Sequence, residues 1–248
     1  DIHDIVTPFP DTKNTPNSGP TVASRTTMVI GKLLEQAALQ MKETLQAEKF
    51  LAKKYNPAAF KKAVINYLKK KGELKVLSQY QHPAEIVWDD KKYEGDAYPT
   101  FAWAVYAAET STNILTYETK VENFVTVQEV GRVVNKILAE GQIEGGVAQA
   151  IGYALYEKVH YQEGRVLNNR LANYVIPTAG DLPPTQVHFL EWNKKYGPGG
   201  AKGIGELPMD GTAPAILNAI CNALNVQLDT IPLLPEDLLK KVEASHGK

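Results

Sequence analysis

The sequence predicts an α+β fold, with mixed sheets and packed helices. Segments with helical spacing of apolar residues are interspersed with β-favouring segments, without the strict strand–helix–strand repeat of a parallel α/β protein. The chain has 248 residues, of which 44% are hydrophobic, and this is enough for a substantial core. The sequence contains neither an internal repeat nor a low-complexity tract.

The N-terminal part is expected to be a loop that leads into a helix. Residues 1–20 are rich in Pro, Thr, Asn and Ser and show no periodicity, which is typical of a loop or linker. In residues 21–45, apolar positions recur every three or four residues and predict a helix. Ser24, Thr26 and Thr27 supply hydroxyl groups at its start, where unpaired amides and the helix dipole favour anions. A plain N-cap is the commoner role for such residues, and an anion site is the alternative.

The middle of the chain predicts further helices and then a β-hairpin. Residues 42–75 are rich in lysine and have apolar positions at helical spacing, as in one or two amphipathic helices with solvated faces. A nucleic-acid surface is disfavoured there, because arginine is absent and aromatic residues are sparse. In residues 98–130, two β-favouring runs flank a turn near Thr112 and Asn113, so we expect a hairpin or adjacent antiparallel strands.

The C-terminal half predicts three helices separated by extended segments. Two of them are expected in residues 128–140 and 142–159, the second with Gly145, Gly146 and Gly152 where a helix or a cofactor could approach closely. Extended segments broken by proline follow in residues 171–191. A last helix is expected in residues 210–224, with Asp210 or Thr212 as its N-cap.

Composition and charge exclude several classes of function. A formal net charge of −1 and a pI near 6.6 show no bias toward nucleic acid or an anionic membrane, and no apolar run is long enough to span a bilayer. The single cysteine, Cys221, rules out an internal disulfide, and the scattered histidines predict no metal bound by protein ligands. The first residues lack the features of a signal peptide, so we expect a cytoplasmic protein. Since the chain opens on Asp rather than Met, we expect its natural start to lie upstream.

The segment 196–208, YGPGGAKGIGELP, is the most unusual stretch of the sequence. It holds five glycines around one lysine and one glutamate, Glu206. The glycine order fits neither a dinucleotide-binding fingerprint nor a phosphate loop. An acid in such a segment is either a turn residue held by backbone amides or a base set beside a ligand. Glu206 is therefore the best single candidate for chemistry.

Several separated stretches, taken together, resemble one enzyme family. NSGPTVASRTT (17–27), GDAYPTFAWA (95–104), VGRVVN (130–135), EGQIEGGVAQAIGYALYE (140–157) and the glycine segment occur in the order and at the spacing found in the molybdenum-binding subunit of the xanthine dehydrogenase and aldehyde oxidase family of molybdenum hydroxylases. The resemblance implies that residues 1–248 form the C-terminal half of the molybdopterin-binding region, with the upstream half absent. Within it we expect two intertwined α+β subdomains, at roughly 1–95 and 96–248.

The resemblance implies roles for individual residues. Glu206 occupies the position of the family's general base beside molybdenum, and it follows Gly205 in the final G-x-G-E motif. Gln142 resembles the glutamine that hydrogen-bonds the cofactor. The helix-start segment that surrounds the pterin corresponds to Ala23, Ser24, Arg25, Thr26 and Thr27.

The same resemblance implies cofactors and partners. Molybdenum would be held by the dithiolene of molybdopterin or of its cytosine dinucleotide, while FAD and 2Fe-2S clusters would lie on other domains or chains. The implied partners are the N-terminal half of the molybdenum subunit, an iron-sulfur subunit and an FAD subunit in an oligomer, with a small-molecule substrate and neither nucleic acid nor membrane. The isolated chain is expected to be inactive.

The implied reaction is hydroxylation of an N-heterocycle such as a purine, with water as the oxygen source. Aldehyde, carbon monoxide and hydroxybenzoyl-CoA oxidoreductases share these motifs and remain alternatives, as does a noncatalytic scaffold. The sequence departs from the family pattern at Gly199, where a bulky aromatic residue is common, and at Lys136, where proline is common. The first departure puts a substrate contact at that position in question.

Overall fold

The chain folds into two compact units, and the glycine segment, residues 196–208, is divided between them. The computed structural model describes residues 2–192 and 195–246. One unit comprises Asp1–Pro99 and Tyr196–Gly199, and the other comprises Thr100–Lys195 and Gly200–Lys248. The glycine segment is thus divided, since its first four residues belong to the first unit and the rest to the second. No helix of the described residues is long and apolar enough to cross a membrane.

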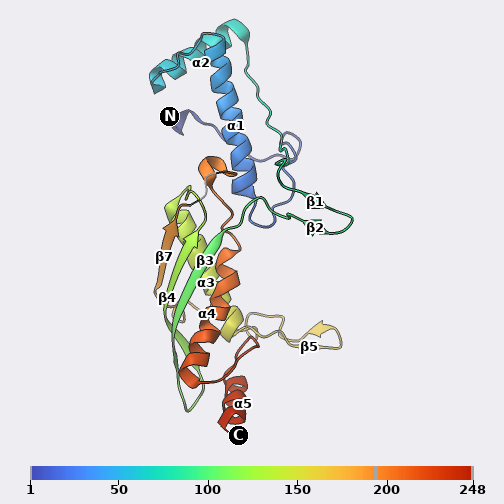
Figure 1. Ribbon diagram of the computed structural model, residues 1–248, viewed down its shortest axis with the longest axis vertical. Helices are drawn as coiled ribbons and strands as arrows, with labels where there is room; N and C mark the ends of the chain where they lie inside the picture. Colours follow the sequence, from blue (N-terminus) through green and yellow to red (C-terminus); the bar gives the residue numbers. More distant parts are fainter. Residues whose placement is uncertain (1, 193–194, 247–248) are drawn as a thin grey trace. The chain divides into compact units, whose positions relative to one another are not determined.

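The first unit is built on two helices and a long irregular N-terminal segment (Figure 1). A short 3-10 helix, η1 (Ile2–Asp4), precedes the loop, and the helices are α1 (Thr26–Ala47) and α2 (Pro57–Lys71). The expected loop, the helix after it and the lysine-rich helix are therefore confirmed. Asn56 caps α2 by accepting a hydrogen bond from the Ala59 amide, with Pro57 in the first helical position.

A small apolar cluster joins the two helices of this unit. It consists of Leu45, Leu51, Ala63 and Tyr67, with Phe50 packed edge-on against Tyr67. The remaining chain of the unit forms a short hairpin of β1 (Trp88–Asp89) and β2 (Glu94–Gly95). Much of the apolar surface of α1 is only partly buried within the unit, as its exposure pattern shows.

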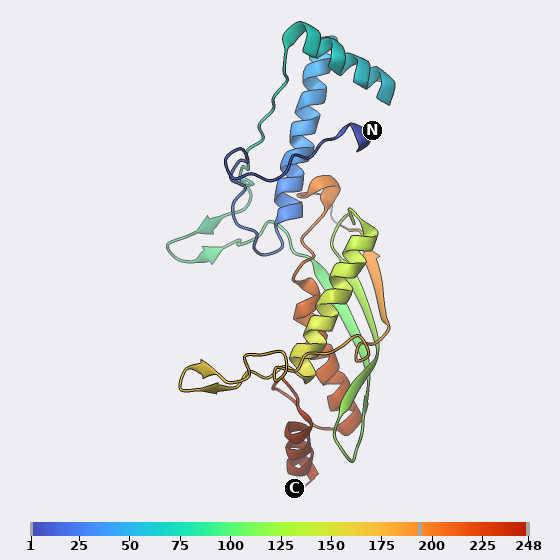
Figure 2. The ribbon, with the colours of Figure 1, turned by 180° about the vertical axis from the view of Figure 1, so that it is seen from behind.

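The second unit is a three-stranded sheet with helices over one face (Figures 1 and 2). β3 (Trp103–Thr112) and β4 (Thr119–Glu129) pair antiparallel, which confirms the predicted hairpin and its turn. β7 (Thr185–Leu190) then pairs parallel with β4. The unit is completed by α3 (Lys136–Leu155), the short hairpin β5 (Tyr161–Gln162) and β6 (Arg165–Val166), α4 (Leu207–Leu224) and α5 (Pro235–His246). One 3-10 turn, η2 (Pro198–Gly200), crosses from the first unit into the second.

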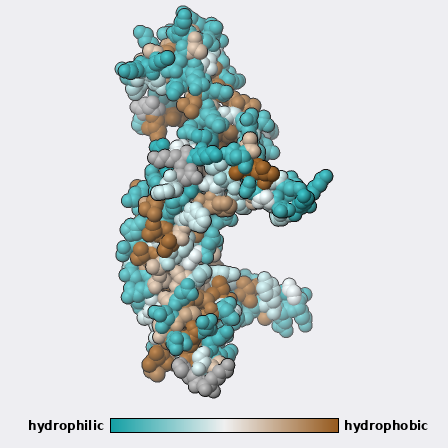
Figure 3. All heavy atoms as spheres, in the orientation of Figure 1, coloured by the Kyte–Doolittle hydropathy of each residue, from teal (hydrophilic) through white to brown (hydrophobic). Residues whose placement is uncertain are grey.

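The core of the second unit lies between the sheet and its helices. Phe124 and Val121 point inward from β4 and pack with fully buried residues of α3 and α4, among them Ile143, Ile151, Ile216 and Ile220. The strand alternation leaves the opposite face open, so that Trp103 and Val105 are each 69% exposed. Figure 3 shows hydrophobic side chains gathered over this sheet region. The buried face of β4 does not follow an apolar–polar alternation, because Thr126 and Gln128 are fully buried on the same side as Phe124.

Two of the helix predictions are wrong in detail. Residues 128–159 contain one helix, α3, instead of two, because β4 continues through Glu129 and Asn135 caps the helix by accepting from the Leu138 amide. Gly141 does not interrupt α3, since it lies on an exposed face of the helix with no close neighbours.

The last predicted helix begins earlier than expected. α4 starts at Leu207, with Glu206 in the N-cap position, so neither Asp210 nor Thr212 is the cap. The Thr212 hydroxyl instead donates to the Pro208 carbonyl inside the first turn, at 2.7 Å. Pro208 suits the start of a helix because its missing N–H is not needed there. Glu206, the candidate base, therefore directly precedes the first turn of α4.

Candidate cofactor and catalytic site

The first residues of the glycine segment pack against α1 within the first unit. Pro198 lies over Gly31, where a Cβ would come within 2.9 Å of the proline ring. The Gly199 amide donates to Glu35 at 3.1 Å. Gly199 itself has a left-handed backbone, with φ 57°, which favours glycine over a bulky side chain. The departure from the family pattern at this position therefore has a local conformational reason.

The next residues are held against the end of β4 in the second unit. The Lys202 amide donates to the Val130 carbonyl at 2.8 Å, and the Arg132 amide donates to the Gly200 carbonyl at 3.3 Å. These two backbone hydrogen bonds pair residues 200–202 with residues 130–132, which directly follow β4. Ala201 and Lys202 are both buried as a result.

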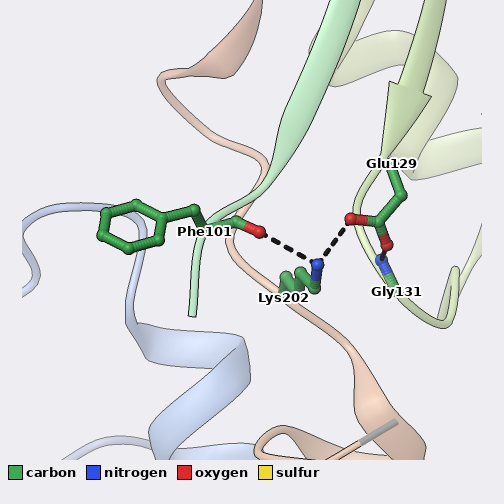
Figure 4. Close-up of polar contacts among 4 residues, drawn as sticks. All are labelled: Phe101, Glu129, Gly131 and Lys202. Carbon is green, nitrogen blue, oxygen red and sulfur yellow. Dashed lines mark hydrogen bonds and ion pairs between the residues drawn. The ribbon is translucent and has the colours of Figure 1, made fainter. Parts of the chain in front are cut away.

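The buried side chain of Lys202 makes an ion pair with Glu129 (Figure 4). Its Nζ lies 2.5 Å from Glu129 Oε2 and donates a second hydrogen bond to the Phe101 carbonyl at 2.9 Å. The other carboxylate oxygen of Glu129 accepts from the Gly131 amide at 3.0 Å. Burial alone would raise the pKa of Glu129, but the hydrogen bonds from Lys202 and Gly131 and the attraction of the ammonium group outweigh it, so the pKa lies below its ordinary value.

The far end of the glycine segment is held by α3 and β3. The Gln142 side chain donates from Nε2 to the Gly205 carbonyl at 2.9 Å. The Tyr106 hydroxyl donates to the Leu207 carbonyl at 2.5 Å. Burial and, to a smaller extent, the nearby charge of Asp210 raise the pKa of Tyr106 above its ordinary value, and they outweigh a hydrogen bond with Gln128 that lowers it. Glu206 is therefore flanked on both sides by carbonyls that side chains of other elements hold in place.

Two glycines let α4 approach its neighbours closely at this point. A Cβ on Gly146 of α3 would lie 2.2 Å from the Pro208 ring, and a Cβ on Gly211 of α4 would lie 2.1 Å from the ring of Tyr106. Gly146 thus serves helix approach, one of the two uses expected for it, whereas Gly145 has no heavy atom within 4 Å of such a Cβ. Glu206 itself is exposed, so its carboxylate is accessible at the surface of the unit.

The helix-start residues lie in the first unit. Arg25 is the N-cap residue of α1 and gives no side-chain cap bond; its Nη1 turns back to the carbonyls of Ser18 and Pro20, at 3.1 and 2.8 Å. Ala23 and Ser24 both have left-handed backbones, with φ 48° and 55°, a conformation that costs about 1 kcal/mol or more for such residues. Thr26 and Thr27 are exposed in the first turn, which contains no acidic residue.

The structure thus brings together some of the predicted residues. Gln142, Gly205 and Glu206 meet in the second unit, and Ala23–Thr27 form one local group in the first. A cavity of about 220 Å³ beside α3 is not lined by any of them; its walls are Glu144, Val147, Ala148, Ile151, Leu182, Pro183 and Thr185. Within the described ranges, three or more His, Cys, Asp or Glu side chains do not gather as a metal site.

Sequence reasoning missed Lys202, Glu129 and Tyr106. The one signal in the sequence was Lys202 itself. Its neighbours in the chain are mostly glycine and other small residues, so a partner for its charge would have to come from elsewhere in the fold. Its partner Glu129 is 73 residues away in the chain, and only the fold brings the two charges together.

A family model described as a molybdopterin cofactor-binding domain matches residues 1–183. The chain therefore belongs to the molybdenum hydroxylases. Its relatives include a putative xanthine dehydrogenase molybdenum-binding subunit of Escherichia coli, 29% identical, and an aldehyde oxidoreductase of Megalodesulfovibrio gigas, 27% identical. The alignments cover 93% and 95% of this chain but only 32% and 25% of those relatives.

A solved structure supports the same fold for this molybdenum hydroxylase chain. The crystal structure of the aldehyde oxidoreductase from Desulfovibrio desulfuricans matches with a TM-score of 0.73 and 28% identity, over 93% of this chain and 24% of the other. The predicted fold class and family are therefore confirmed. The chain spans about a third or less of the length of the proteins that it matches.

The residues at the start of α1 fit the anionic part of a molybdopterin. A helix start leaves amide donors without intrahelical acceptors, and it attracts negative charge. Here the hydroxyls of Thr26 and Thr27 add further donors, and the first turn of α1 has no carboxylate to repel a phosphate. A donor set of this kind suits the phosphate of the pterin.

Proposed function

We propose that residues 1–248 form the C-terminal half of the molybdopterin-binding region of a molybdenum hydroxylase, with Glu206 as the general base. The observation that supports this most directly is the placement of Glu206. Its carboxylate is exposed at the entrance of α4, while the peptide groups around it are fixed by hydrogen bonds from Gln142 and Tyr106. A base works best when its position is held by the surrounding structure and its carboxylate stays reachable.

In this proposal, the residues of the chain bind the cofactor and move one proton. Ser24, Thr26, Thr27 and the first amides of α1 bind the pterin phosphate, while Ala23 and Arg25 shape the loop that presents them. When bound, the molybdenum cofactor supplies the two-electron oxidation of the substrate. A Glu206 carboxylate oxygen accepts the proton of the hydroxyl group that attacks the electron-poor carbon. Gln142 and Gly205 keep that carboxylate at the cofactor, and a proton transfer of this kind contributes about 10² to 10⁴ in rate.

The proposed substrate is an N-heterocycle such as a purine, with water as the oxygen source. The similarity to a xanthine dehydrogenase subunit supports this class, and the aldehyde oxidoreductase relative, at nearly the same identity, supports an aldehyde as the alternative. Because the relatives are three to four times as long, the proposed complex also contains the N-terminal half of the molybdenum subunit. It further contains iron-sulfur and FAD subunits, and the cofactor is carried as molybdopterin or its cytosine dinucleotide.

The test is the Glu206→Gln variant of the native complex, purified through this chain. Molybdenum content should stay at the wild-type level, while turnover of purines and aldehydes falls by about 10² to 10⁴. Glu144→Gln is the matched control, because Glu144 is an exposed acid of the same unit and should leave turnover unchanged. Wild-type turnover by Glu206→Gln would refute the base assignment, and a wild-type complex without molybdenum would favour a noncatalytic scaffold.

A further inference from the structure

Lys202, which pairs with Glu129, lies four residues before Glu206, and the proposed proton transfer does not use either member of this ion pair. Its side chains are only 6% and 12% exposed. Buried charges occur in proteins when they are paired, and every hydrogen-bonding group seen here has a partner: Lys202 with Glu129 and Phe101, Glu129 with Lys202 and Gly131. Because apolar side chains of similar volume usually stabilise such a site as well or better, stability alone does not account for this arrangement.

The pair joins three separate elements at one point of the glycine segment. Phe101 lies just before β3, Glu129 is the last residue of β4, and Lys202 belongs to the segment itself (Figure 4). Together with the backbone bond from Lys202 to Val130, the pair fixes both the position and the direction of the chain at Lys202. The segment thus leaves the sheet along one defined path.

The four residues that follow would not keep that path unaided. Gly203 and Gly205 lie between Lys202 and Glu206, and glycine has more backbone freedom than any other residue. The Tyr106 hydroxyl holds the chain again at Leu207, and Gln142 holds it at Gly205. The chain around Glu206 is therefore held at three points, at Lys202 and Gly205 on its N-terminal side and at Leu207 on its C-terminal side.

We propose that the Lys202–Glu129 ion pair is a positioning device that sets the place of the Glu206 carboxylate. The inference rests on the proposed function, in which Glu206 is the base. Lys202 acts through the backbone of residues 203–205 and touches neither cofactor nor substrate. Releasing this anchor lets the carboxylate move while the rest of the unit stays folded, and a displacement of about 1 Å at a catalytic group can lower a rate about 10²-fold.

The experiment uses the native complex carrying Lys202→Met together with Glu129→Leu, so that no uncompensated charge is buried. We expect kcat to fall about 10- to 100-fold, with KM changed less than about 2-fold and molybdenum content unchanged. The single variant Lys202→Arg, which keeps the charge and leaves Glu129 in place, should have a kcat between that of the wild type and that of the Lys202→Met and Glu129→Leu variant. Ile220→Val, a core substitution in the distal part of α4, is the control for lost stability and should lower the thermal midpoint without lowering kcat.

The decisive measurement is a double-mutant cycle with Glu206→Gln. If the pair acts only by placing Glu206, adding the Lys202 and Glu129 changes to Glu206→Gln should lower kcat no further, because groups that act as a unit are not additive. A full additional loss, a loss of molybdenum, or unchanged kcat in the Lys202→Met and Glu129→Leu variant would each overturn the inference. Wild-type turnover by Glu206→Gln would instead remove the proposed function itself, so the two failures are distinguishable.

Discussion

The starts of α1 and α4 are two loop-to-helix junctions that are built differently. Neither N-cap residue, Arg25 or Glu206, caps its helix with a side chain, and both have helical backbone angles. The loop before α1 reaches its helix through two consecutive left-handed residues and is tied down mainly by Arg25. The loop before α4 is held by side chains from β3, β4 and α3.

This difference matches the two tasks proposed for the junctions. A helix start that binds phosphate has to leave its amide and hydroxyl donors accessible to the ligand. It is therefore held by few side chains from the rest of its unit. A catalytic carboxylate has to stay in one place, so several elements constrain the chain around it. Disturbing the α4 junction should therefore be more costly than disturbing the α1 junction, and the following substitutions test this in decreasing order of effect.

The largest effect on stability is expected for Glu129→Gln. It leaves the Lys202 charge buried without its partner, which typically lowers the free energy of unfolding by about 3–5 kcal/mol at pH 7. Because the folded-state pKa of Glu129 lies below its ordinary value of 4.5, this contribution is fully present above about pH 4.5 and is lost as the pH falls through the folded-state value. Urea unfolding of both proteins between pH 7 and pH 3 should show the difference shrinking with acid.

Glu122→Gln is the matched control on the same strand. Glu122 pairs with Lys120 at 3.1 Å, but both side chains are solvent-exposed, so its replacement should change stability little. An equal loss of stability in the two variants would show that burial of the Lys202–Glu129 pair does not matter.

A smaller loss is expected from crowding the contact between α3 and α4. Gly146→Ala would place a Cβ 2.2 Å from the rigid Pro208 ring, which should lower the free energy of unfolding by about 1–3 kcal/mol. The neighbouring Gly145→Ala is the control, since its Cβ would meet open space and alanine favours a helix by up to about 1 kcal/mol. Thermal midpoints that shift in opposite directions would support the close approach, and equal midpoints would contradict it.

Gln142→Ala should cost less stability and show a separate effect on the cofactor. Loss of its hydrogen bond to Gly205 should lower the free energy of unfolding by about 0.5–1.5 kcal/mol. If Gln142 also hydrogen-bonds the cofactor, as the family resemblance implies, the molybdenum retained by the purified complex should fall. Gln149→Ala, an exposed position of the same helix, should change neither quantity. Unchanged molybdenum in Gln142→Ala would remove the cofactor role and leave the loop contact.

The smallest effect, and one of opposite sign, is expected at the α1 junction. Ala23→Gly relieves a left-handed backbone at φ 48°, which should offset the entropy of glycine and raise the free energy of unfolding by about 0.5 kcal/mol. Ala38→Gly, in an exposed part of α1, should instead lower it by about 1 kcal/mol. Destabilisation by Ala23→Gly would mean that the left-handed residues are not strained.

Local patterns in the sequence predicted the elements whose signals lie within a few residues. The two β-favouring runs around the turn near Thr112 and Asn113 predicted the hairpin, and the helical spacing of apolar residues predicted α1 and α2. The same local signals misplaced the start of α4, because a cap at Asp210 or Thr212 was as good a local choice as Glu206. They also divided α3 in two, since residues 128–135 have apolar spacing that suits either a strand or a helix.

The sequence by itself determined the family, the candidate base and the residues around the start of α1, because motifs are read along the chain and need no partners. Only the tertiary structure decided how Glu206 is held. The parallel pairing of β4 with β7, the Tyr106 bond to Leu207 and the Lys202–Glu129 pair all join residues more than 50 positions apart. Whether Lys202 and Glu129 meet depends on which strands and loops pack together. Once the two side chains are buried, they have to pair, because an unpaired buried charge is costly.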